Sequence, residues 1–174
     1  LRNYYMFQIW PGACAMGPTG DQLRDVQRRL PSLYSHMKEM SILGVVPGVG
    51  CHTPRAGYFR IGQLIPPLVK EDIYGLTGTT NSAPNLRQAC FTTTNRTAIA
   101  LVFDQSMAWV ALSTNFLFLD GLAGRVVSGA AATNVITLQL SAPSTNQTIT
   151  YLKGSVWVPA GNNQAQLIYG SNNI

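Results

Sequence analysis

The pattern of apolar residues changes character near residue 76, and this change constrains the fold more than any other feature of the sequence. Residues 4–10 (YYMFQIW) and 40–46 (MSILGVV) are continuous apolar runs of strand length, and each precedes a segment with helical spacing of apolar residues. The resulting order of strand, helix, strand and helix favours an α/β fold, in which helices cover a parallel sheet.

Two helices are predicted in this first part of the chain. Thr19 and Gln22 have the spacing of a capping box, and the apolar residues between 23 and 30 share one helical face. Pro31 either interrupts this helix or begins another. Apolar residues between 58 and 69 recur at helical spacing and predict the second helix.

The chain after residue 76 is rich in Thr, Asn, Ser, Ala and Val and contains short apolar runs separated by turn residues. The runs are residues 98–104, 116–120, 125–129, 135–140 and 148–152. Such a series predicts a small antiparallel β-sandwich. We therefore expect a first domain over residues 1–76, a Gly-, Thr- and Pro-containing linker over 77–85, and a sandwich domain over 86–174. Both ends of the sequence look cut, so we expect a piece of a longer protein.

Composition argues against several classes of function. The net charge of +5 reflects few acidic residues, and the twelve Lys and Arg are scattered rather than clustered as on a nucleic-acid surface. The sequence contains no apolar run near the roughly 18 residues that a membrane span needs. The three cysteines lack the spacing of a zinc site or of a disulfide framework, although they allow one disulfide. We therefore expect no nucleic-acid partner, membrane span or metal.

His52 is the candidate catalytic residue. It follows a glycine-rich turn after the second predicted strand, and ligands of open parallel sheets bind beyond the carboxyl ends of the strands. The loop leaving the first strand, residues 8–12, can face the same crevice. A histidine there can act as a general base, but the sequence contains neither a Gly-Asp-Ser block nor a Gly-x-Ser-x-Gly motif to supply a nucleophile. Without other information, a lone histidine in such a loop is more often structural.

The run from residue 52 to 75 resembles the final conserved block of the SGNH hydrolases, specifically the sialate O-acetylesterase-like carbohydrate esterases. In that block the catalytic histidine precedes a proline, a small-residue turn and a helix that carries a glycine and ends in Tyr-Gly. The matching residues here are His52, Pro54, Gly57, Gly62 and Tyr74-Gly75. Arg24 and Gln27 are similar to the Arg-x-x-Gln pair of a helix in that family, and residues 83–157 are similar to the β-sandwich that often follows the esterase domain.

The resemblance implies that the chain is the C-terminal part of a flavodoxin-like SGNH domain followed by a β-sandwich. The whole enzyme would be a secreted or periplasmic bacterial serine hydrolase that needs no cofactor and removes acetyl esters from sugars such as sialate or polysaccharide. His52 would be its base. The serine and the oxyanion-hole residues lie in earlier blocks of the family, so this piece should be inactive alone. The family's usual aspartate, three residues before the histidine, corresponds to Val49, so the orienting carboxylate comes from elsewhere or the site works as a Ser-His dyad.

Other residues have competing interpretations. Trp10 could stack on a sugar ring or lie in the core, and Arg24 and Gln27 could reach the crevice or belong to a solvated helix face. Cys51 adjoins His52, but side chains of adjacent residues usually diverge and the family uses serine, so we do not expect it to be a nucleophile. The alternative for the whole chain is a non-catalytic carbohydrate-binding or structural module, in which the sandwich matters and His52 is incidental.

Overall fold

The computed structural model describes residues 3–43, 45, 51–76, 82–156 and 167–170. These residues form a mixed α/β structure that divides into two compact units. The first unit contains the described residues up to 83 together with 154–156, and the second contains 84–153 and 167–170. Much of the predicted linker, residues 77–81, lies outside the described residues. None of the helices in the described part of the chain is both long and apolar enough to cross a membrane.

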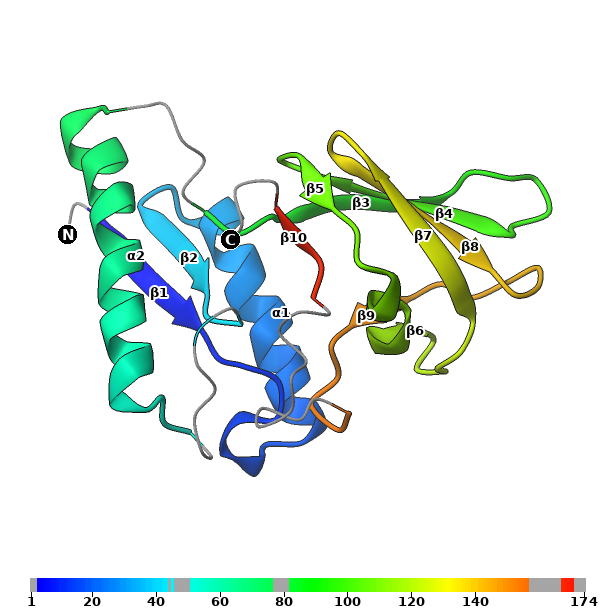
Figure 1. The fold of residues 1–174 in the computed structure, drawn as a ribbon, viewed down its shortest axis with the longest axis horizontal. Coiled ribbons are helices and arrows are strands. Elements are labelled where there is room, and N and C mark those ends of the chain that lie inside the picture. Colours follow the sequence, from blue (N-terminus) through cyan, green and yellow to red (C-terminus); the bar gives the residue numbers. More distant parts are fainter. Residues whose placement is uncertain (1–2, 44, 46–50, 77–81, 157–166, 171–174) are drawn as a thin grey trace. The chain divides into compact units, whose positions relative to one another are not determined.

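The first unit has the predicted order of strand, helix, strand and helix (Figure 1). Its elements are β1 (Tyr4–Gln8), α1 (Pro18–Leu33), β2 (Met37–Ser41) and α2 (Arg55–Tyr74), with a short 3-10 helix η1 (Ala13–Ala15) after β1. β1 and β2 pair in parallel, from Tyr4 opposite Met37 to Gln8 opposite Ser41. The pairing confirms that both strands end at the same edge of a parallel sheet.

The ends of the first helix differ from the prediction. α1 begins at Pro18 after Gly17, and no side chain caps it, so the predicted capping box is wrong. Proline suits this first position because its missing N–H would have no partner in the helix. Pro31 neither ends α1 nor begins another helix, because it lies in the last turn, where the helix continues to Leu33.

The second strand begins and ends earlier than the predicted run of residues 40–46. Lys38 and Glu39 lie inside β2, and these charged residues are absent from the apolar pattern that predicts a buried strand. Lys38 is held there by an ion pair, with its Nζ 2.9 Å from Asp72 Oδ1 on α2.

The sheet of β1 and β2 lies between the two helices, as Figure 1 shows. Neighbouring side chains of a strand point to opposite faces. Lys38 therefore faces α2, whereas Glu39 faces α1, whose Arg24 and Arg28 act on its carboxyl group. Gln8 lies on the same face as Glu39 and donates from Nε2 to the carbonyl oxygen of Arg24 at 2.9 Å. Polar contacts thus attach one helix to each face.

The second unit consists of antiparallel strands, as the sequence predicts. Its elements are β3 (Leu86–Phe91), β4 (Ala98–Phe103), β5 (Met107–Ala108), the 3-10 helix η2 (Ala111–Phe116), β6 (Leu117–Leu119), β7 (Val126–Ala132), β8 (Val135–Leu140), β9 (Ile149–Tyr151) and β10 (Tyr169–Gly170). One sheet has the order β3-β4-β8-β7, and β6-β9 and β5-β10 form separate pairs. The strands β3, β5 and β10 were not among the five predicted.

One apolar core joins the sheets of the second unit. Ile136 and Leu138 of β8 are fully buried and lie opposite Leu101 and Ile99 of β4. Side chains of β6 and β7 belong to the same cluster. The four-stranded sheet and β6 therefore bury their apolar side chains together, which is the principle of a sandwich.

Within the first unit, Gly154 packs directly on the loop after β1. Its N–H donates to both carboxylate oxygens of Asp21, at 2.9 and 3.1 Å. A Cβ atom at Gly154 would lie only 2.7 Å from the backbone nitrogen of Gly12, so only glycine fits this approach.

We predict opposite effects for two alanine substitutions in this unit. Gly154→Ala should lower the free energy of unfolding by about 1–3 kcal/mol, because the backbone of Gly12 must move. Gly62→Ala, in α2 with no atom within 4 Å of the new Cβ, should raise it by up to about 1 kcal/mol. Chemical denaturation of the two variants measures both effects. Equal midpoints for Gly154→Ala and the unsubstituted protein would contradict the close packing.

Candidate functional site

The chain segments that leave β1 and β2 meet in a small apolar cluster. Trp10 and Ala13 follow β1, Ile42 and Val45 follow β2, and all four are buried together. The cluster confirms that the two loops lie side by side at the carboxyl edge of the sheet.

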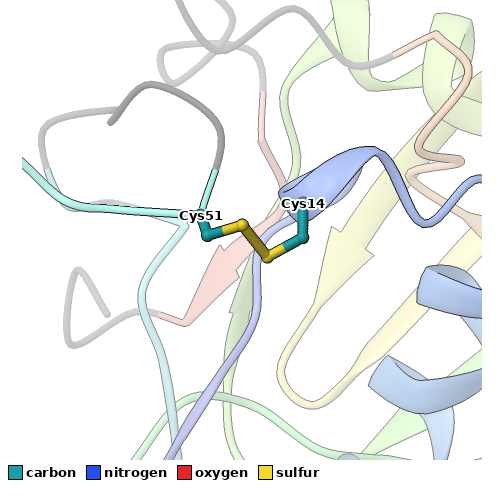
Figure 2. Close-up of a disulfide and its surroundings, with 2 residues drawn as sticks. All are labelled: Cys14 and Cys51. Carbon is teal, nitrogen blue, oxygen red and sulfur yellow. A yellow bond between two sulfur atoms is a disulfide. The ribbon is translucent and has the colours of Figure 1, made fainter.

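A disulfide between Cys14 and Cys51 links these two loops (Figure 2). The cysteines are 37 residues apart in the sequence, and their Cα atoms are 4.6 Å apart. Cys90, on β3, is free and exposed. The sequence allowed one disulfide but could not pair the cysteines, because the pairing depends on the parallel register that brings the two loops together.

His52 follows the disulfide directly and is exposed. The next residue, Thr53, is buried, and α2 begins two residues later at Arg55. Among the residues that the structure describes, none hydrogen-bonds to the imidazole. Val49, at the position where the family has its aspartate, lies outside the described residues. His52 therefore lies in the loop at the carboxyl edge, fixed in the chain between a disulfide and a buried threonine.

Arg24 and Gln27 lie on the side of α1 that faces the sheet. Gln27 accepts a hydrogen bond at Oε1 from the backbone N–H of Ile9 at 3.1 Å, just beyond the end of β1. Arg24 is buried, and its Nη1 lies 3.7 Å from Asp21 Oδ1. Gln27 thus supports the carboxyl end of β1 through its side chain, and Arg24 does so through its backbone carbonyl oxygen, which accepts from Gln8. No contact among the described residues joins either of them to His52.

Trp10 is in the core of the first unit. Only 5% of its surface is exposed, and Ile61 and Leu64 of α2 belong to the partly buried side chains around its cluster. A stacking contact with a sugar ring would need a face of the indole to be uncovered.

Glu39 is a titratable residue that the sequence gave no reason to select. Burial raises the pKa of its carboxyl group to about 7, and the positive charges of Arg24 and then Arg28 offset only part of this effect. The sequence around it gives little signal, because Glu39 lies just before the apolar run of residues 40–46 and next to Lys38. Its position in the middle of β2 makes it part of the packing against α1 rather than of the loop edge.

Within the described residues, no group of three or more His, Cys, Asp or Glu side chains is arranged to hold a metal ion. What the edge of the sheet presents is an accessible imidazole, which can accept and return a proton.

Comparisons with known proteins give a likeness of fold and no match of sequence. No family model matches the chain, and no curated protein matches its sequence. Among solved structures, the chain is similar to a carbohydrate acetylesterase from Xanthomonas citri, with a TM-score of 0.71 and 13% sequence identity. The likeness covers 98% of this chain and 39% of that enzyme. The likeness is one of fold.

The buried carboxyl group of Glu39 predicts how stability depends on pH. The folded protein holds this proton up to about pH 7, whereas an unfolded chain releases it near 4.5. The free energy of unfolding should therefore fall by about 2 kcal/mol between pH 5 and pH 8. Glu39→Gln should remove most of this fall and make the protein more stable at pH 8.

Denaturant titrations at several pH values test this expectation. Glu71→Gln changes the chain's other glutamate and is the matched control, which should keep the pH dependence of the unsubstituted protein. If Glu39→Gln keeps it too, Glu39 is not the group responsible.

Proposed function

We propose that this chain is the C-terminal part of a carbohydrate O-acetylesterase of the SGNH type and supplies the catalytic histidine. The observation that carries the proposal is the exposed His52, in the loop at the carboxyl edge of a parallel sheet, in a chain that shares its fold with part of a carbohydrate acetylesterase. The motif around residues 52–75 supports the same assignment. The first unit would then be the end of a flavodoxin-like domain.

In this proposal His52 works as a general base and then as a general acid. Its imidazole takes the proton of a serine hydroxyl while the serine oxygen attacks the acetyl carbonyl. The imidazolium then protonates the sugar oxygen as the ester bond breaks. In the second stage His52 takes a proton from water while the water oxygen attacks the acyl carbonyl, and it then protonates the serine oxygen as acetate leaves. The serine and the oxyanion donors come from a part of the protein outside residues 1–174.

An uncovered face of α2 supports the idea that more of the domain packs on this unit. Tyr58, Phe59 and Ile73 each expose more than half of their surface. A two-stranded parallel sheet is also smaller than such sheets usually are. The matched region is 39% of the neighbouring enzyme, so that enzyme contains a further part outside the likeness.

We further propose that the substrate is an acetylated sugar, such as sialate or a polysaccharide, and that the protein is secreted or periplasmic in a bacterium. The substrate class follows the neighbouring esterase and the motif. The location is supported by the Cys14–Cys51 disulfide, because disulfides persist in oxidising compartments.

We predict that His52→Ala lowers kcat for p-nitrophenyl acetate by about 10²–10⁴-fold in the full-length product of the gene. His36→Ala is the matched control, since His36 is the only other histidine of these 174 residues and lies in the turn before β2. It should leave kcat unchanged. The 174-residue chain itself should show no hydrolysis above buffer.

The same assay separates the two classes of function. Full activity in His52→Ala would mean that His52 is a loop residue and the proposal is wrong. A full-length product that binds acetylated sugars but hydrolyses no ester would favour the non-catalytic module.

A further inference from the structure

The Cys14–Cys51 disulfide joins a packed turn after β1 to the residue that precedes the candidate base. Cys14 is itself exposed, but it belongs to η1, in which Ala13 is buried, and Pro11 just before η1 is buried as well. The turn is closed by two backbone hydrogen bonds, from Ala13 N to Trp10 O at 3.2 Å and from Met16 N to Ala13 O at 3.3 Å. The loop is further packed by the close approach of Gly12 and Gly154. Cys14 is therefore fixed to the body of the first unit.

The other end is attached next to the candidate base. Cys51 is exposed and is bonded to His52 through the backbone. On the other side of His52, Thr53 is buried and leads into α2. The histidine is thus flanked in the chain by the disulfide on its N-terminal side and by a buried threonine on its C-terminal side.

A histidine base needs a fixed orientation, which a carboxylate hydrogen-bonded to its ring usually provides. No carboxylate among the described residues makes such a bond to His52. A covalent link at the adjacent residue restricts the backbone from which the imidazole extends, and it does so without changing the charge of the site.

We propose that Cys14 and Cys51 are positioning residues for His52, whose disulfide holds the imidazole where the ester reacts. This inference rests on the proposed function. Removing the link lets the loop move relative to the loop after β1, and displacement of a catalytic group by about 1 Å can cost about 10²-fold in rate. A link that acts only on the position of the imidazole should lower kcat and leave KM nearly unchanged.

The test compares four forms of the full-length product: unsubstituted, Cys14→Ser/Cys51→Ser, Cys90→Ser and His52→Ala. Hydrolysis of p-nitrophenyl acetate is measured at 20 °C, with thermal melting to confirm that each form is folded at that temperature. The double serine variant should lose about 10–100-fold in kcat with KM within about twofold. Cys90→Ser removes an exposed free thiol and should behave as the unsubstituted protein.

The decisive measurement repeats the double serine substitution in the His52→Ala protein. If the disulfide acts through His52, its removal should cause no further loss of the residual activity there, because the group that it positions is already absent. An equal further loss would show that the disulfide supports the site in general and would overturn the positioning role.

Three other outcomes distinguish the positioning role from the proposed function. Unchanged kcat in the double serine variant, with His52→Ala inactive, overturns the positioning role but leaves the proposed function intact. Full activity in His52→Ala overturns the proposed function itself. If the double serine variant is unfolded at 20 °C, the disulfide is needed for the stability of the fold. This outcome also overturns the positioning role.

Discussion

The parallel pairing of β1 with β2 requires the chain to return to the starting edge of the sheet between the two strands. The returning segment is α1, which covers one face, and α2 continues from the second strand to cover the other. Parallel strands also end at the same edge, so the segments that follow them must be neighbours. The apolar cluster around Trp10, the disulfide and the position of His52 are consequences of this one arrangement.

The polar residues of the strands show how such a small sheet is fixed between its helices. Lys38 pairs with Asp72 on one face, while Glu39 on the other lies near the positive charges of α1. The two sites differ in their solvent contact. The side chain of Lys38 is partly exposed to solvent and pairs with Asp72, whereas burial raises the pKa of Glu39 despite the nearby arginines. The first contact specifies where α2 packs, and the second makes the packing of α1 sensitive to pH.

Much of the order of elements could be predicted from the sequence, because strands buried on both faces leave apolar runs and helices leave a 3.6-residue period. The prediction failed where tertiary contacts replace that signal. Lys38 is tolerated in β2 because Asp72 on α2 pairs with it, and Glu39 because burial favours its neutral form and the charges of Arg24 and Arg28 lie nearby. α1 begins at Pro18 without the capping box. The pairing of Cys14 with Cys51 could not be predicted at all, since it depends on strand register rather than on any local pattern.

The candidate site likewise contains one residue that the sequence could select and several contacts that it could not predict. Spacing after residue 52 was enough to select His52, because the motif is local and the histidine precedes a helix. Arg24 and Gln27 were selected because they match the Arg-x-x-Gln pair of the resembled family, but such a match does not specify what each side chain contacts. The sheet places both against the end of β1, where Gln27 hydrogen-bonds to the backbone beyond the strand. Support for the loop that carries Trp10 and Cys14 is therefore built from α1, and the disulfide extends that support to the loop that carries His52. The residues that hold this edge together are thus distributed over elements that no short motif can link.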